Sequence, residues 1–389
     1  MKVALLHKRL APVGGTEGYV WELAGRLAAA GEEVHVVCAE AEGVPDPRVR
    51  VRQVPILPLG PTARMVSFAL SAERFLGRER YDLVHGFGKT LRHDLFRLGG
   101  GCHATYLERA HAAGRPEWVR GLARSTPHQR AALAIERRTF APGNYRLLVA
   151  NSRMVRDDLV ARYGVPAERV RVLYSGVDLE RFHPRLRRTL GEEVRRQRGL
   201  SPEEVLLGFV GTGFVRKGLA PLLRALAILR ARGERVRLLV VGRDRRERAF
   251  RRLASRLGLD GSVSFVGARS DPERFLAASD LFVLPTLYDP FANATLEAMA
   301  CGVPAVTTEA NGAAEAIEAG KSGAVLPAPA SPEAIADRIL PFLDRRAREK
   351  ASAAARGAAE RFPREAHYRE VLRLYPEVLA GKGGGPARA

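Results

Sequence analysis

Two carboxylic acids, Asp289 and Glu297, lie eight residues apart in the stretch YDPFANATLEAMACG (288–302). The stretch follows DLFVLPT (280–286), an apolar run that predicts a buried strand. Asp before Pro is a common helix start, so the pattern predicts a helix from Asp289-Pro290 to about residue 300. Eight helical residues rise about 12 Å, roughly the reach from a sugar across a diphosphate to a ribose. The spacing therefore suits one acid at each end of a nucleotide-sugar.

A purely structural role explains Asp289 more easily than Glu297. Capping of the helix can by itself account for Asp289. Glu297 lies beside the expected core positions Leu296, Met299 and Ala300, where a carboxylate should not be buried without a partner. The N–H groups at the helix start would lie near the phosphates; they belong to Phe291, Ala292 and Asn293.

A second candidate loop is GFVGTGFVRKGLAPLL (208–223). Its glycines do not have the G-x-G-x-x-G spacing of a dinucleotide-binding turn. Instead Arg216 and Lys217 follow a buried strand and precede a helix, where a diphosphate would lie. Fixed cations can neutralise the charge of a departing nucleotide. The alternative is a solvated pair of surface charges.

A third loop, APVGGTEGYVWEL (11–23), joins the first strand to the first helix. Gly14 and Gly15 would let backbone N–H groups approach an anion closely, and the helix start adds its positive end. A tight turn without a ligand explains the two glycines equally well.

Short apolar runs alternate with helix-like stretches along the chain, which predicts parallel sheets built from βαβ units. The fold class is therefore α/β, with two similar doubly wound domains facing a cleft. We expect a domain at 1–183, a second at 184–365, a C-terminal helix at 366–380 that could return to the first domain, and a disordered tail at 381–389. The expected strands are 2–7, 33–39, 81–87, 145–152, 205–211, 235–242, 262–267, 280–286, 304–308 and 323–327.

The bulk composition suggests a cytoplasmic protein. The apolar stretch of the N-terminus is too short for a signal peptide, and no apolar run could span a bilayer. The three cysteines, Cys38, Cys102 and Cys301, lie far apart, as expected of reduced thiols. No D-x-D triplet and no cluster with ligand spacing occurs, so we expect metal-independent chemistry without a resident cofactor.

The net charge of +20 is unevenly distributed. Residues 51–200 carry 28 Lys and Arg against 14 Asp and Glu, which suggests a basic face for an anionic partner. An Arg-rich composition spread over solvated surfaces is the alternative.

The set of motifs resembles glycosyltransferase family 4, retaining enzymes with the two-domain GT-B fold. The resemblance covers nearly the whole chain. It includes the acid-x(7)-Glu pattern, the Gly-Gly loop, SGVDLERFHP, VSFVGARSD and AASDLFVLPT. Within the family, residues 86–107 and GTGFVRKG look most like the lipopolysaccharide core glucosyltransferases.

The sequence departs from the family at three positions. Asp289 replaces the usual Glu, and Thr212 replaces the Arg usually found after FVG, so the phosphate role passes to Arg216. Gly100 stands where an acid or His was expected, which leaves His103 as a candidate catalytic residue of the first domain.

The resemblance implies transfer of a hexose, expected to be glucose from UDP-glucose, to a lipopolysaccharide-core or other cell-envelope glycan with retention. Glu297 would bind the ribose and Asp289 the sugar hydroxyls. Arg216 and Lys217 would stabilise the leaving diphosphate, and the Gly14-Gly15 loop would close over the phosphates from the other domain. A donor phosphate oxygen would help to deprotonate the acceptor.

Three other functions remain as alternatives. A glycoside hydrolase also uses two acids, but it would need neither the cation pair nor a phosphate loop. A nucleotide-sugar epimerase of similar fold would consume its substrate without an acceptor. A basic nucleic-acid binder would explain the charge, but no recognised module is present and the aromatic residues do not alternate with the basic runs. We therefore expect no nucleic-acid partner.

An anionic membrane surface is the further partner that we expect, through residues 104–140. Arg outnumbers the acids in this segment, and bulky apolar residues such as Trp118 accompany them. A lipid-linked acceptor would require such contact, so the enzyme could be peripheral on the inner face of the cytoplasmic membrane. Ordinary amphipathic helices interrupted by Pro116 and Pro127 are the alternative.

Overall fold

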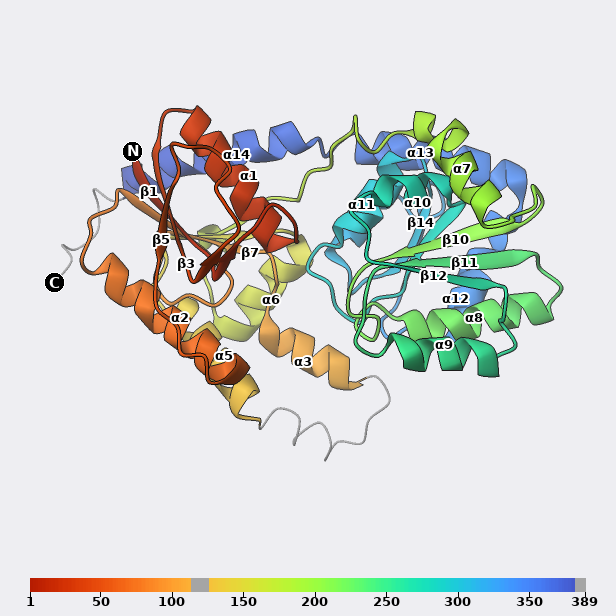
Figure 1. Ribbon diagram of the computed structural model, residues 1–389, viewed down its shortest axis with the longest axis horizontal. Coiled ribbons are helices and arrows are strands. Elements are labelled where there is room, and N and C mark those ends of the chain that lie inside the picture. Colours follow the sequence, from red (N-terminus) through yellow and green to blue (C-terminus); the bar gives the residue numbers. More distant parts are fainter. Residues whose placement is uncertain (113–125, 382–389) are drawn as a thin grey trace. The chain divides into compact units, whose positions relative to one another are not determined.

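The computed structural model describes residues 1–112 and 126–381, and its contacts divide the chain into two compact units (Figure 1). The first unit comprises Met1–Tyr174 and the C-terminal residues from His367, and the second comprises Ser175–Ala366. Residues 175–183, which the sequence analysis placed in the first domain, make their contacts in the second unit. Residues 382–389 of the expected tail lie outside the described part.

The first unit is built on a parallel seven-stranded sheet in the order β5-β3-β1-β6-β7-β8-β9. Its strands are β1 (Lys2–Leu6), β3 (Glu33–Cys38), β5 (Arg50–Gln53), β6 (Leu83–Phe87), β7 (Leu95–Leu98), β8 (Leu147–Ala150) and β9 (Val170–Val172). A small parallel pair joins β2 (Arg9–Leu10) to β4 (Glu40–Ala41). The helices are α1 (Thr16–Ala29), α2 (Gly60–Leu76), α3 (His103–Ala112), α5 (Pro127–Thr139), α6 (Arg153–Tyr163) and most of α14 (Arg364–Ala380).

The second unit contains a parallel six-stranded sheet in the order β12-β11-β10-β13-β14-β15. Its strands are β10 (Val205–Val210), β11 (Val236–Val241), β12 (Val263–Gly267), β13 (Leu281–Leu284), β14 (Ala305–Thr308) and β15 (Gly323–Leu326). Its α-helices are α7 (Leu190–Gln197), α8 (Leu219–Ala231), α9 (Glu247–Arg256), α10 (Pro272–Ala278), α11 (Asn293–Ala300), α12 (Pro332–Ile339) and α13 (Arg345–Ala359). Figure 1 shows helices lying on both faces of this sheet.

Both sheets are doubly wound, which confirms the α/β fold class. In the first unit the chain proceeds outward from β1 in both directions, so the strand order reverses between β1 and β6. In the second unit it reverses between β10 and β13. Ligands of open α/β sheets bind at such switch points, outside the carboxyl ends of the strands.

Three strands of the first sheet were not expected from the sequence. The edge strands β5 and β9 are partly exposed and carry Arg residues, so neither forms a continuous apolar run. The short strand β7 (LFRL) contains Arg97, which is buried in the structure. Because Arg residues interrupt these three strands, a search for continuous apolar runs does not find them.

The C-terminal helix α14 completes the core of the first unit. Five of its buried residues pack against strands β1, β3 and β6 and helix α1; they are Tyr368, Val371, Leu374, Tyr375 and Val378. The Tyr375 hydroxyl lies 2.9 Å from Nδ1 of the buried His85 on β6. Nδ1 of His367 donates a hydrogen bond of 2.6 Å to the carbonyl of Tyr174.

Among the described residues no helix is both long and apolar enough to cross a membrane.

Replacing Tyr375 with Ala should destabilise the first unit by about 3–5 kcal/mol, because a fully buried aromatic ring leaves a cavity. Trp21 lies on α1 of the first unit, so its fluorescence during urea unfolding reports on that unit. Arg369→Ala, on the exposed side of the same helix, is the matched control and should shift stability by less than about 0.5 kcal/mol. Equal unfolding midpoints for Tyr375→Ala and wild type would show that the helix does not stabilise this unit.

Candidate functional site

The switch point of the second sheet brings together the two loops that the sequence singled out. One loop follows β10 and carries Thr212, Arg216 and Lys217, and the other follows β13 and carries Asp289. The approach is very close at Gly218: a Cβ there would lie 2.0 Å from the carbonyl oxygen of Pro285. With a φ of +80°, this position requires glycine on both counts.

A carboxylate between two cations forms the centre of the site. Oδ2 of Asp289 lies 2.6 Å from the Lys217 ammonium and 2.6 Å from Nη1 of Arg216. Lys217 and Asp289 are buried, and Arg216 is partly exposed. The same Nη1 donates to the carbonyl of Tyr288 at 3.1 Å. The two cations therefore share one carboxylate, and the cluster of these three residues carries a net positive charge.

The charges of this cluster shift one another's pKa values. Burial alone would raise the pKa of Asp289, but the neighbouring Lys217 and Arg216 charges outweigh burial and hold it below its usual value. Burial lowers the pKa of Lys217, and the Asp289 charge opposes that effect. The carboxylate is thus an anion at neutral pH and compensates the buried cations.

The backbone fixes both loops around this cluster. The carbonyl of Arg216 accepts hydrogen bonds from the Leu287 N–H at 2.8 Å and the Thr286 hydroxyl at 2.9 Å. The Asp289 N–H donates to the carbonyl of Ala310 at 2.8 Å. The loops after β10, β13 and β14 are consequently tied to one another, and the cluster is held on a rigid frame.

The helix beside the cluster begins later than the sequence suggested. Helix α11 starts at Asn293, not at Pro290, and Asp289 does not cap it. Asp289 and Glu297 are therefore not joined by eight continuous helical residues, and the 12 Å rise does not apply. The prediction was wrong because the carboxylate of Asp289 binds two cations instead of the helix N–H groups.

Asn311 organises the helix start and was missed by the sequence analysis. Its Oδ1 accepts hydrogen bonds of 3.0 Å from the N–H groups of Ala292 and Ala313. Its Nδ2 donates to the hydroxyls of Thr295 and Thr307 at 3.1 and 3.0 Å. An Asn-Gly pair in the loop that follows the buried strand β14 was the available signal.

The helix-start N–H groups differ in their availability. Phe291 N–H donates weakly to Oδ1 of Asp289 at 3.3 Å, and that of Ala292 is used by Asn311. Asn293 is the first residue of the helix, so its N–H has no intrahelical acceptor. The residue is also exposed. Of the three positions proposed for phosphate contact, Asn293 is therefore the most available.

Glu297 lies on α11, and its carboxylate has no hydrogen bond or ion pair with any residue that the structure describes. Burial raises its pKa to about 7, and the Glu273 charge adds to that effect, whereas Arg181 and Lys217 oppose it. Its neighbours Leu296, Met299 and Ala300 are buried, as expected. A half-buried carboxylate without a partner and with a raised pKa is a candidate ligand-binding group.

Thr212 and Asp244 complete the loop after β10. Thr212 is exposed at the turn. Oδ2 of Asp244, which follows β11, accepts a hydrogen bond of 2.7 Å from the N–H of Phe214. This acid was not singled out from the sequence, where it stands among several Arg residues.

The remaining predicted residues lie in the first unit. Gly14 adopts a φ of +124°, and Gly15 precedes the first residue of α1. His103 begins α3, and its backbone N–H donates to the buried carboxylate of Glu136 at 2.7 Å. Nε2 of its ring pairs with Oε1 of Gln129. The structure thus groups the second-unit residues together and places these three residues in the other unit.

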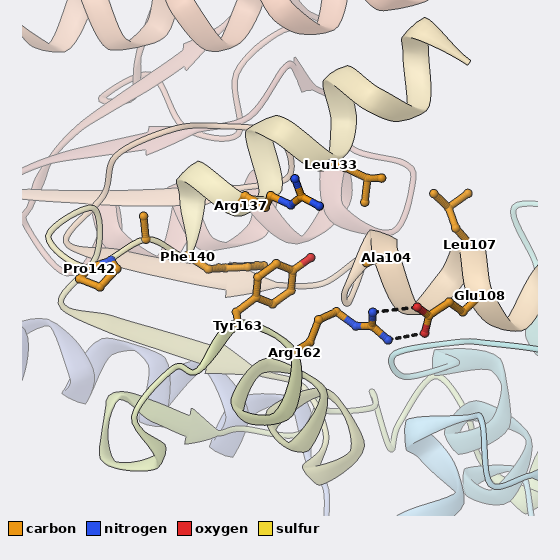
Figure 2. Close-up of a pocket in the computed structure, with 10 residues that line it drawn as sticks. Ala104, Leu107, Glu108, Leu133, Arg137, Phe140, Pro142, Arg162 and Tyr163 are labelled. Carbon is orange, nitrogen blue, oxygen red and sulfur yellow. Dashed lines mark hydrogen bonds and ion pairs between the residues drawn. The ribbon is translucent and has the colours of Figure 1, made fainter. Parts of the chain in front are cut away.

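A separate pocket of about 590 Å³ lies between α3, α5 and α6 of the first unit (Figure 2). An ion pair between Glu108 and Arg162 closes one side of it. It is lined by Ala104, Leu107, Glu108, Leu133, Arg137, Phe140, Ala141, Pro142, Arg162 and Tyr163. None of the predicted site residues lines this pocket, so we do not assign it to the site. In the described part of the chain, no group of three or more His, Cys, Asp or Glu residues could hold a metal ion.

Two family models match the chain and together account for most of it. The model described as Glycosyltransferase Family 4 matches residues 13–181, and the model described as Glycosyl transferases group 1 matches residues 191–361. The second match contains the Asp289 cluster and Glu297.

Curated relatives are similar over nearly the full length. The lipopolysaccharide glucosyltransferase WaaG of Escherichia coli K12 is 28% identical over 335 residues, which cover 86% of this chain and 87% of WaaG. A D-inositol 3-phosphate glycosyltransferase of Salinispora arenicola is 29% identical over 408 residues, which cover 95% of this chain and 88% of the relative.

Solved structures show the same architecture. The crystal structure of WaaG superposes with a TM-score of 0.82 at 27% identity and covers 96% of this chain and 99% of that one. The structure of Anabaena HepE in complex with UDP-glucose has a TM-score of 0.73 and covers 97% of this chain and 100% of that one. At 21% identity, the second likeness concerns the fold alone.

Replacing Asp289 with Asn should destabilise the second unit by about 3–5 kcal/mol, because two cations would lose their buried counter-charge. The pKa of Asp289 is depressed in the folded state, so its stabilisation is present above about pH 4 and is lost as pH falls through the folded value. The acid-induced loss of stability should therefore be smaller in Asp289→Asn than in wild type.

Hydrogen–deuterium exchange of peptides from β13 to α11 measures this effect locally. Asp337→Asn, which breaks the exposed pair with Arg232, is the control and should change stability by at most about 1 kcal/mol. Unchanged exchange in Asp289→Asn would contradict a stabilising role for the cluster.

Proposed function

The chain belongs to the glycosyltransferases of the GT-B type, and on this premise we propose that it transfers a hexose from a nucleotide-sugar to a cell-envelope glycan with retention. One observation carries the proposal. At the switch point of the second sheet, Arg216 and Lys217 share the carboxylate of Asp289. Glu297, on the helix that follows, adds a carboxylate without a partner among the described residues. This combination suits a ligand that bears both a diphosphate and hydroxyl groups.

Each charged group of the cluster has a role that follows from its chemistry. Arg216 and Lys217 would bind the diphosphate and stabilise the charge that develops on it as the glycosidic bond breaks. The exposed N–H of Asn293 would add a hydrogen bond at the positive end of α11. Thr212, at the turn that precedes Arg216, would also contact the nucleotide-sugar.

The two carboxylates would recognise the two ends of the donor. Glu297 would accept hydrogen bonds from ribose hydroxyls. Asp289 would use Oδ1, which among the described residues accepts the long hydrogen bond from the Phe291 N–H, to accept from hydroxyls of the sugar. Asp289 stands where the family usually has Glu, so its side chain is shorter by one methylene.

We propose UDP-glucose as the donor and a lipopolysaccharide-core glycan as the acceptor. WaaG, a relative that covers 86% of this chain, is a lipopolysaccharide glucosyltransferase by name, which supports glucose as the sugar and lipopolysaccharide as the acceptor. Other relatives, at 29% identity, are D-inositol 3-phosphate glycosyltransferases, so that acceptor belongs in any test. As the family resemblance implies, the proposed mechanism uses no protein nucleophile. A donor phosphate oxygen would help to deprotonate the acceptor hydroxyl.

In the first unit, the Gly14-Gly15 loop and His103 are proposed to contact substrate.

We also propose that the enzyme is cytoplasmic and peripheral on an anionic membrane, where it would meet a lipid-linked acceptor. This part of the proposal rests on the Arg-rich composition of residues 104–140. Residues 113–125 of that segment, with Trp118, lie outside the described residues.

Initial-rate assays of the purified chain test the proposed function. Two donors, UDP-glucose and GDP-mannose, are each supplied with a lipopolysaccharide core oligosaccharide or with inositol 3-phosphate. We expect transfer from UDP-glucose to the core oligosaccharide without added metal, and NMR of the product should show retention of the anomeric configuration.

Three results would argue against this function. Consumption of UDP-glucose at full rate without acceptor would indicate an epimerase or a hydrolase. An inverted product would exclude retention. Absence of transfer from both donors to both acceptors would contradict the proposed activity itself.

A further inference from the structure

The switch point of the first sheet holds a histidine that the sequence analysis did not single out. His7 directly follows β1, and its ring lies against Gly88, which directly follows β6. A Cβ on Gly88 would lie 3.6 Å from Cδ2 and 3.7 Å from Nε2 of His7. Because β1 and β6 are the strands between which the order reverses, this imidazole lies at the ligand-binding edge of the sheet.

The hydrogen bonds of His7 determine which ring nitrogen carries the proton. Nδ1 lies 2.7 Å from the carbonyl oxygen of Arg9, which can only accept, so Nδ1 must be the donor. The longer contact of 3.4 Å from the Arg9 N–H to the same nitrogen cannot compete with it. In the neutral ring, Nε2 therefore presents a lone pair, and no described residue donates a hydrogen bond to it.

The ring should remain neutral under ordinary assay conditions. Burial lowers the pKa of His7, and the Lys8 charge adds to that effect. The bond to the Arg9 carbonyl and the charge of Glu17 on α1 oppose it. The net direction is downward, which keeps Nε2 available as a hydrogen-bond acceptor near pH 7.

Glu17 supplies a second acceptor in the same region. It lies in the first turn of α1, and a Cβ on Gly14 would be 2.8 Å from its Oε2. Its carboxylate makes no hydrogen bond or ion pair with the described residues. An imidazole lone pair and a carboxylate both require donors, and hydroxyl groups of a sugar or another polyol are donors that carry no charge.

We propose that Nε2 of His7 and the carboxylate of Glu17 bind hydroxyl groups of the acceptor. The inference rests on the proposed glycosyl transfer and assigns the hydroxyl-binding residues of the first unit. His103 is less suited to this role through Nε2, because that nitrogen already pairs with Gln129.

Kinetics of His7→Gln and Glu17→Gln test the assignment in the full-length chain. Each substitution should lower kcat/KM for the acceptor by about 10–100-fold, the usual range for one lost hydrogen bond in a buried site. The KM for UDP-glucose should be unchanged. Arg9→Gln is the matched control: it removes an exposed cation from the same loop but retains the carbonyl that orients His7.

The pH profile distinguishes substrate contact from a structural role. In wild type, protonation of His7 removes the lone pair, so KM for the acceptor should rise as pH falls through the pKa of His7, which burial holds below its ordinary value. His7→Gln should lose this rise, because an amide gains no proton in this pH range. An acceptor kcat/KM within twofold of wild type, or an unaltered pH profile, would overturn the role of His7.

A binding measurement separates this inference from the proposed function. In ¹³C-histidine-labelled protein, the signal absent from His7→Gln identifies His7. If wild type transfers no sugar, a shift of that signal with inositol 3-phosphate or with the core oligosaccharide would still support a polyol site. No shift with either probe would overturn it.

Discussion

The ion cluster of Asp289, Arg216 and Lys217 is the constraint on which the second unit depends. Removing two cations from water is costly, and only a close counter-charge makes it tolerable. One carboxylate at 2.6 Å from both cations provides that charge and leaves a positive excess. The same arrangement stabilises the empty protein and attracts an anionic ligand. Because the cluster joins the loops after β10 and β13, the fold and the proposed diphosphate site require the same contacts.

Topology explains why chemistry collects where it does. Each sheet begins at a central strand and extends in both directions, so two loops diverge at each switch point and leave room for a ligand. In the second unit this point carries cations and Glu297, which suit a nucleotide. In the first unit it carries His7 beside Gly88, with the Glu17 carboxylate nearby, which suits uncharged hydroxyl groups. The two units therefore present complementary chemistry at equivalent positions of similar folds.

The sequence predicted the fold class and the apolar strands because continuous apolar runs are a direct consequence of burial on both faces. It could not reveal β5, β7 or β9, whose Arg residues break that pattern. It identified Asp289, Arg216 and Lys217 as chemically notable, but not their mutual contact, which joins residues more than seventy positions apart. The start of α11 was misjudged for the same reason: long-range bonds to the cations and to Asn311 override the local capping signal. The free nitrogen of His7 depends on a backbone bond and has no sequence signature.

Calorimetric titration with UDP tests the central claim, a nucleotide site at the second switch point, most directly. Burial raises the pKa of Glu297 to about 7, and ribose hydroxyls should favour its ionised form. UDP should therefore bind wild type more tightly as pH rises from 6 to 8, with proton release on binding near pH 6.5. Glu297→Gln should bind about 10–100-fold more weakly and without this pH dependence, whereas the exposed Glu333→Gln should match wild type. Equal affinity and equal pH dependence in wild type and Glu297→Gln would contradict the account.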